Sequence, residues 1–469
     1  MTSTDAGVQR AVDPARPPRP RRATWTALRP LVLRLHFYAG ILIAPFLLVA
    51  AATGLLYAAS FQIENVVYRH ELTAPVSRTS VPLSEQVTAA RQALPEGKVT
   101  AVRPAAEPGL TTRVLMDVPN LPESTQMAVF VDPGTGQVRG TLESYGGSGA
   151  LPVRAWISDL HRHLHLGEPG RIYSELAASW LWVVALGGLA LWLSRRRRDG
   201  RRLRGLFAPD RAATGLRRTL SWHGSVGLWA ALGVLFLSAT GLTWSKYAGE
   251  NIGELRTRFG WATPSISTDL GEHAGHTGHA GHVAGGGRAG ATTDVGIDKI
   301  TQAAASWRLS GPLEIVPPAE PGAAYVVKEI RKTAPTRLDQ LAFDPASGQI
   351  VGELRFADYP LAAKLTEWGI DAHMGLLFGP ANQIVLAAIA AGLITLIVLG
   401  YRMWWRRRPT RGFGRPYPRG GWRDAHWGVL APLALFALVV GYFLPLMGIS
   451  LAAFLVIDIL LGLRSRVAG

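Results

Sequence analysis

His36-Phe-Tyr-Ala-Gly40 and His223-Gly-Ser-Val-Gly227 share one pattern, a histidine four residues before a glycine, and each leads into a long apolar run. The runs end in Thr53-Gly54-Leu55 and Thr240-Gly241-Leu242, so equivalent residues lie 187 positions apart (36 and 223, 40 and 227, 53 and 240). About 20 apolar residues suffice for a helix that crosses a bilayer. The sequence therefore predicts a duplicated membrane protein whose repeated helices begin with histidine.

A second repeat has a different offset, 212 positions (132 and 344, 161 and 373). Asp132-Pro133 matches Asp344-Pro345, and His161 matches His373. What the two copies share most clearly is histidine at the predicted membrane edges. Neutral imidazole is a good ligand for haem iron and for other metals. An electron-carrying membrane protein is therefore the leading hypothesis.

Composition excludes several alternatives for this chain of 469 residues. Hydrophobic residues make up 48% and charged residues 17%, which suits a mixed membrane and soluble protein. The absence of cysteine excludes disulfides, cysteine-ligated clusters and covalent c-type haem. The net charge of +16 comes from arginines beside the apolar runs, the pattern of the positive-inside rule. Nucleic acid is accordingly not an expected partner.

Apolar runs and arginine clusters divide the chain into segments. The first half comprises a basic, disordered cytoplasmic tail (1–34), a first transmembrane helix (35–60), a first external domain (62–151), an outer histidine segment with the second transmembrane helix (152–194) and a basic cytoplasmic loop (195–219). The second half repeats this order with a third transmembrane helix (220–247), a second external domain (250–366), an outer histidine segment with the fourth transmembrane helix (367–405) and a second basic cytoplasmic loop (406–426). A hairpin of the last two helices (427–463) follows. This predicts a multi-pass protein of the cytoplasmic membrane with six spans and both termini in the cytoplasm. Each external domain is expected to be α+β, because a short helix precedes alternating strands.

Several motifs carry a resemblance to a known family. The turns Asp132-Pro-Gly-Thr-Gly-Gln137 and Asp344-Pro-Ala-Ser-Gly-Gln349, the histidine helices, and the closing Trp404-Trp-Arg-Arg-Arg408 resemble the PepSY-associated transmembrane helix family. The resemblance covers the chain from about residue 31 to 408. It implies two PepSY-like external domains, bound haem and a role in iron uptake, because members are described as iron-regulated membrane proteins and include ferric-siderophore reductases.

His36 and His223 are the candidate haem ligands at the cytoplasmic side, because they occupy equivalent positions at the ends of two spans. Gly40 and Gly227 lie one helical turn further on and are expected to leave room for a flat macrocycle. The alternative is a pair of interfacial histidines that hydrogen-bond to lipid headgroups or carbonyls, with the glycines serving helix packing.

At the outer side, His161 and His373 form the natural pair, and His165 is an alternative ligand because it lies one turn after His161. A histidine-rich interfacial helix without a cofactor remains the other interpretation.

His426, at the edge of the fifth span, is an alternative ligand at the cytoplasmic side, and the role of Asp458 in the last span is open.

A Gly-rich linker at 271–290 contains four further histidines, which are candidate metal ligands: His273, His276, His279 and His282. The tract is interpreted either as a flexible linker or as an element that captures metal for the outer site. Oligomeric state does not follow from the sequence.

The predicted function is haem-dependent electron transfer that reduces an extracytoplasmic ferric complex, such as a ferric siderophore, with two b-type haems. No flavin or nicotinamide motif occurs, so the expected electron donor is a cytoplasmic reductase or quinol. One alternative is a non-enzymatic PepSY protein that binds a peptidase or receptor. The other is a protein that handles copper or another metal through the external histidine tract.

Overall fold

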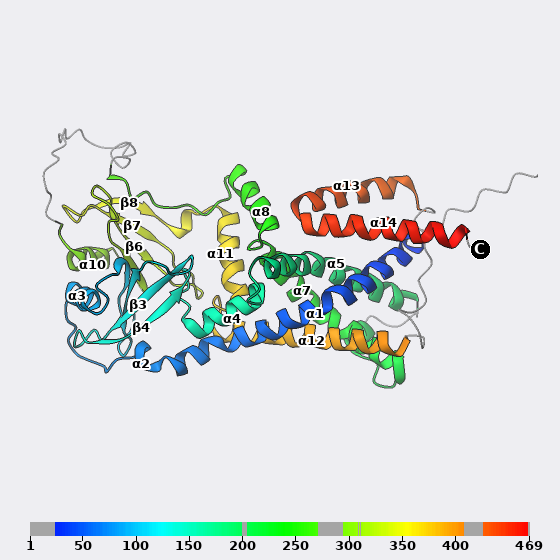
Figure 1. The fold of residues 1–469 in the computed structure, drawn as a ribbon, viewed down its shortest axis with the longest axis horizontal. Coiled ribbons are helices and arrows are strands. Elements are labelled where there is room, and N and C mark those ends of the chain that lie inside the picture. The colour runs from blue at the N-terminus through cyan, green and yellow to red at the C-terminus, as the bar shows by residue number, and fades with distance from the viewer. Residues whose placement is uncertain are drawn as a thin grey trace, which may run out of the picture.

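The computed structural model describes residues 24–198, 204–270, 294–307, 309, 311–407 and 425–467. Long helices form a bundle, and a β-sheet lies at one end of it (Figure 1). Within the described residues, five helices are long and apolar enough to cross a membrane: α1 (Thr24–Val67), α5 (Glu168–Arg198), α7 (Gly215–Leu242), α12 (Pro380–Arg407) and α14 (Pro445–Val467). A sixth apolar helix, α13 (Trp427–Phe443), has 17 residues.

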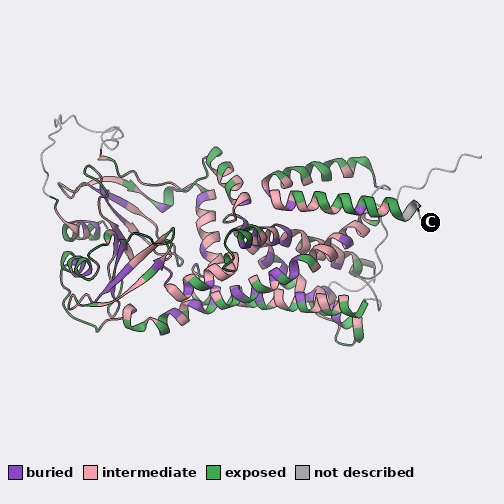
Figure 2. Ribbon diagram, in the orientation of Figure 1, coloured by how far each residue is buried: buried purple, intermediate pink, exposed green. Residues whose placement is uncertain are grey.

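Four of these helices form the centre of the bundle. Helices α1 and α7 each pack against both α5 and α12, which places α1 and α7 at diagonal corners. Helices α13 and α14 form a hairpin beside them and are exposed along most of their length (Figure 2). The predicted disordered tail is corrected in part, because residues 24–34 are the first turns of α1. The apolar side chains of Leu31, Val32 and Leu33 extend the span in that direction.

The eight strands in the described residues belong to one antiparallel sheet with the order β4-β3-β2-β1-β5-β6-β7-β8. They are β1 (Lys98–Arg103), β2 (Thr112–Asp117), β3 (Thr125–Val131), β4 (Val138–Tyr145), β5 (Leu313–Val316), β6 (Tyr325–Glu329), β7 (Gln340–Phe343) and β8 (Ile350–Leu354). Strands β1 and β5 join the halves, with Val102 opposite Ile315. The two external regions, which the sequence analysis treats as separate domains, therefore share one sheet.

The shared sheet also has a shared core. Helices α3 (Leu83–Ala93) and α10 (Ile297–Ser306) cover the face that points away from the bundle (Figure 1). Val87, Val114 and Val129 from the first half are buried together with Ile300 and Val327 from the second. Because neither half closes this core alone, burial of apolar surface holds the two halves together.

Two helices connect the sheet to the bundle. Helix α4 (Pro152–His163) packs against α1, and α11 (Leu361–His373) packs against α7. Both lie between the sheet and the long helices (Figure 1). The remaining described helices are α2 (Arg69–Leu72), α6 (Arg204–Phe207), α8 (Tyr247–Arg258) and the 3-10 turn η1 (Phe356–Asp358). The ends of α4 and α11 bring His161 and His373 to the sheet end of the bundle.

Candidate functional site

Two histidines from diagonal helices meet at the end of the bundle that is remote from the sheet. His36 of α1 and His223 of α7 have ring centroids 6.4 Å apart, with their planes at 80°. We call them the far-side pair. The repeat predicts them as equivalents, and the fold brings them side by side because α1 and α7 face each other across the bundle axis.

Each ring of the far-side pair is held by a backbone carbonyl of a neighbouring helix. Nδ1 of His36 lies 2.9 Å from the carbonyl oxygen of Val184, and Nδ1 of His223 lies 3.1 Å from that of Leu396. A carbonyl only accepts hydrogen bonds, so Nδ1 carries the proton in both rings. Nε2 is left with a free lone pair, the arrangement typical of imidazoles that ligate metal.

The spacing of the far-side rings suits two axial ligands of one metal ion. A metal–nitrogen bond of about 2 Å, with about 1 Å more to the ring centroid, separates two such centroids by about 6 Å. The observed 6.4 Å between His36 and His223 is close to this value.

Glycines allow the two rings to approach the adjacent helices. A Cβ atom at Gly188 would lie 2.9 Å from Cε1 of His36, so residue 188 has no room for a side chain. At the equivalent Gly400, a Cβ atom would lie 3.8 Å from Cε1 of His223. A Cβ atom at Gly40, which the sequence analysis expects beside the macrocycle, would meet no atom within 4 Å.

The second pair lies at the sheet end of the bundle, and we call it the sheet-side pair. Nδ1 of His161 is 3.0 Å from Oγ1 of Thr53, and Nδ1 of His373 is 2.6 Å from Oγ1 of Thr240. Each threonine hydroxyl donates its own hydrogen to a carbonyl of the preceding turn, so it accepts from the ring. Nδ1 therefore again carries the proton, and Nε2 is again the free nitrogen.

The environment of the sheet-side pair favours neutral imidazole. Burial lowers the pKa of His161. Burial, and secondarily the nearby His161, lower the pKa of His373 to about 4. Desolvation disfavours the charged ring, and both rings are consequently neutral at physiological pH. Neutral imidazole is the form that coordinates metal.

The donor set distinguishes haem from a bare metal ion. Among the described residues, no group of three or more His, Asp or Glu side chains could hold an ion. Two imidazoles alone provide too few ligands for a bare ion, because protein zinc sites have at least three protein ligands. A porphyrin supplies its equatorial ligands itself and requires only axial ones. Both pairs therefore fit haem better than an isolated ion.

The other described candidate histidines, His165 and His426, have partners outside the two pairs. Nε2 of His165 lies 3.1 Å from the carbonyl oxygen of Trp156, and the ring lies against that indole. His426 is the N-cap of α13, where Nδ1 accepts a hydrogen bond from the backbone N–H of Gly428. His161, rather than His165, has the threonine contact that matches His373. The candidate metal ligands of the histidine tract, His273 to His282, lie outside the described residues.

Asp458 pairs with an arginine close to the far-side pair. Nη2 of Arg34 lies 2.9 Å from Oδ2 of Asp458, and only 1% and 7% of the two side chains are exposed. Arg34 precedes His36 by two residues on α1, whereas Asp458 belongs to α14. Pairing compensates two charges that are costly within a bilayer. The ion pair therefore connects α14 of the C-terminal hairpin to α1, at a position two residues before His36.

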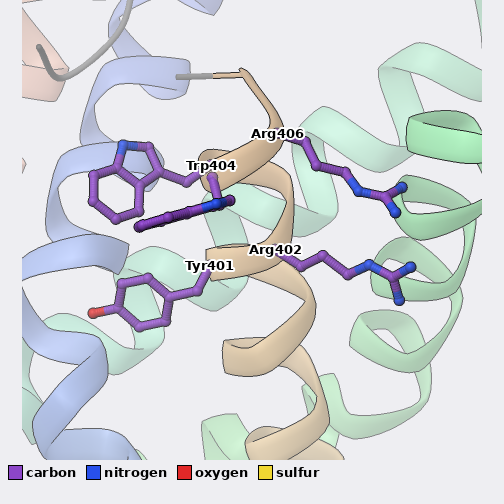
Figure 3. A pocket seen from close by; sticks show the side chains of 5 residues that line it. Tyr401, Arg402, Trp404 and Arg406 are labelled. Atoms are coloured by element: carbon purple, nitrogen blue, oxygen red, sulfur yellow. The ribbon is translucent and has the colours of Figure 1, made fainter. Parts of the chain in front are cut away.

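An open cavity of about 460 Å³ lies at the same end of the bundle and is lined by the last turns of α12. Tyr401 and Trp404 extend to one side of this helix, and Arg402 and Arg406 extend to the other (Figure 3). The hydroxyl of Tyr401 donates to the carbonyl of Ile41 on α1 at 3.0 Å. Aromatic rings together with arginines at a helix end are typical of a membrane–water interface. We therefore interpret this cavity as part of that interface.

Some residues of the site were not among the sequence candidates. Val184 and Leu396 act through their carbonyl oxygens, which carry no side-chain signal. Gly188 and Gly400 do have a signal, since they lie 212 positions apart (188 and 400), like the second repeat. Applying that offset to every glycine of the spans would have found them.

Comparison with known families supports the predicted resemblance. A profile described as the PepSY-associated TM region matches residues 33–407 of the chain. The match spans both repeats and includes all four histidines of the two pairs. A comparison with curated proteins finds no match. We conclude that the chain is a membrane protein that belongs to the PepSY-associated TM region family.

Proposed function

We propose that each histidine pair holds one b-type haem and that the protein transfers electrons through the membrane to a ferric complex outside the cell membrane. The observation that carries this proposal is the repeated ligand geometry. In both pairs a neighbouring helix fixes Nδ1–H and leaves Nε2 free. Chance contacts of interfacial histidines give no reason for the same tautomer in both members of two repeat-related pairs.

The role of the chain in this function is to hold, orient and shield its cofactors. Haem, when bound, supplies one-electron chemistry. His36 with His223, and His161 with His373, would each hold one haem, and ligation by two imidazoles would favour electron transfer over oxygen binding. Carbonyl and hydroxyl groups that accept from Nδ1–H raise the basicity of the ligating nitrogen and fix the plane of the ring.

The length of α1 supports a position of the two pairs in different leaflets. His36 and Thr53, the partner of His161, both belong to α1. A rise of about 1.5 Å per residue separates them by about 25 Å, most of the hydrocarbon thickness of a bilayer. The proposed path of electrons therefore runs from the far-side pair to the sheet-side pair.

We propose that the far side faces the cytoplasm, because the arginine clusters lie at that end of the spans. A cytoplasmic reductase or quinol is then the proposed donor. The acceptor is a ferric chelate near the sheet, where iron(III) takes one electron and becomes iron(II). Oxygen donors hold the softer iron(II) less tightly, so reduction promotes release of the metal.

A single-turnover experiment tests this function. The purified protein is reduced with dithionite, freed of excess reductant and mixed with a ferric trihydroxamate while the haem bands are followed. We expect oxidation of both haems and the appearance of iron(II) trapped by a ferrous chelator. His373→Ala is expected to slow oxidation of the far-side haem strongly. If the reduced wild-type protein persists with every ferric chelate tried, the proposed reaction is wrong.

A further inference from the structure

A row of charged residues crosses the sheet on the face toward the bundle. Arg103 of β1 lies directly opposite Arg113 of β2, and Arg113 lies opposite Phe130 of β3. In the other direction, Arg103 contacts Glu314 of β5, which lies opposite Lys328 of β6. These side chains point away from α3 and α10, because the alternate residues Val102 and Val114 fill the core beneath those helices.

The positive charges of this row exceed the negative ones. The carboxylate of Glu314 contacts both Arg103 and Lys328 at 2.6 Å, so one negative charge is shared between two positive charges. Within the described part of the chain, Arg113 has no carboxylate partner, and its guanidinium lies 5.3 Å from the centroid of the Phe130 ring. The row consequently carries about two positive charges in excess at neutral pH.

The carboxylate of Glu64 does not neutralise the excess positive charge of this row. Both oxygens of Glu64 are engaged by Arg154, at 2.9 and 3.2 Å. Like charges placed directly opposite each other destabilise a sheet. Burial, and next the charge of Arg103, lower the pKa of Arg113 to about 10, which still leaves the guanidinium protonated at neutral pH. The fold thus maintains an unfavourable cationic pair.

The pair lies close to the sheet-side histidines. A Cβ atom at Gly149 would meet Nη1 of Arg103 at 2.5 Å and Nη1 of Arg113 at 3.6 Å, so both guanidinium groups converge on this loop. Arg154, at the start of α4, donates to the carbonyl of Gly149 at 3.1 Å. From Arg154 to His161 the helix rises by about 10 Å. An anion on the pair would therefore lie near the proposed point of electron exit.

We propose that Arg103 and Arg113 form a binding site for carboxylate groups of an anionic ferric chelate, the acceptor in the proposed reaction. This inference rests on the proposed function and adds the charge class of the substrate. A planar guanidinium group binds a carboxylate through two parallel hydrogen bonds. A bound carboxylate would therefore compensate part of the excess positive charge of the row. Lys328, with 34% of its side chain exposed, is more accessible than Arg103, whose side chain is 12% exposed, and it adds a positive charge at the edge of the site.

The test measures binding without electron transfer. The purified full-length protein is titrated by calorimetry with gallium(III) citrate, an anionic and redox-inert substitute for ferric citrate, and with an uncharged gallium(III) trihydroxamate. We expect Arg113→Gln to raise the Kd for gallium citrate at least tenfold and to leave the trihydroxamate unaffected. Arg91→Gln is the matched control, since Arg91 is an exposed arginine of α3 on the other face of the sheet. It is expected to change neither Kd.

A variant of opposite sign separates binding from a structural role. Glu314→Gln increases the positive excess and is expected to lower the Kd for gallium citrate, whereas damage to the sheet would raise it. Equal effects of Arg113→Gln and Arg91→Gln would overturn the inference. So would loss of the sheet-side haem in Arg113→Gln, which would assign the arginines to the cofactor. Citrate binding that depends on Arg113 in a protein without haem would instead refute the proposed function alone.

Discussion

The contact between Gly188 and His36 gives a sharp prediction for a single methyl group. In Gly188→Ala, the new Cβ would lie 2.9 Å from Cε1 of His36. Carbon atoms pack at about 3.5–4.0 Å, so the ring must move by about 0.6–1 Å. Ligand distances at a metal site tolerate only about 0.2 Å. The variant is therefore expected to displace the ring of His36, the proposed ligand of the far-side haem.

The energetic cost follows from overpacking and from the strained hydrogen bond to Val184. Together these amount to about 3 kcal/mol, or roughly a hundredfold in haem affinity. Haem per chain, determined on the purified variant together with its reduced spectrum, is expected to fall toward one.

Gly400→Ala is the matched control, because its Cβ would lie at an ordinary 3.8 Å from His223 and should leave both haems bound. Two intact low-spin haems in Gly188→Ala would refute the assignment of His36 as a ligand.

Four further variants test other parts of the site. Thr53→Val removes the acceptor for Nδ1–H of the sheet-side ring and should weaken that haem about tenfold or more, measured as haem loss to apomyoglobin. His165→Ala should retain both haems and unchanged absorption bands, and loss of one band would make residue 165 the ligand. Asp458→Asn removes the charge of one partner of Arg34 in a buried ion pair and should lower the thermal midpoint of the protein in detergent. Deletion of residues 271–290 should leave the haem spectrum and the single-turnover rate unchanged, whereas loss of activity would favour metal capture by the histidine tract.

The long apolar helices and the proximity of His36 to His223 follow from the sequence for a physical reason. Long apolar runs define spans by length alone, and duplication makes equivalent residues identifiable by their offset. His36 and His223 lie together because a duplicated unit that packs against itself brings equivalent positions to opposite sides of one axis. The same logic identifies His161 with His373, which contact Thr53 and Thr240 in equivalent ways.

Contacts that depend on helix rotation and on long-range packing do not follow from the pattern. The carbonyl of Val184 becomes a partner of His36 only when α5 has a particular rotation about its axis. The union of the two sheet halves rests on one antiparallel pairing, between Val102 and Ile315, across more than two hundred residues of chain. Alternation of apolar residues predicts strands but not which strand edges meet.

The far-side histidines lie between packed helices and do not line the open cavity of about 460 Å³ at the end of α12. A haem held by Nε2 of His36 and His223 would occupy space between packed helices, and the cavity beside Tyr401 lies at the edge instead. The proposal of a haem at the far-side pair therefore rests on the histidine geometry and not on the size of a cavity.

The most direct test of the central claim is the stoichiometry and ligation of haem in the purified protein. Pyridine haemochrome quantification, combined with oxidised and dithionite-reduced absorption spectra, is expected to give two low-spin, bis-histidine b-type haems per chain. His36→Ala should remove one haem and His373→Ala the other. A protein that stays colourless when haem is supplied during expression, or variants that keep both haems, would contradict the claim.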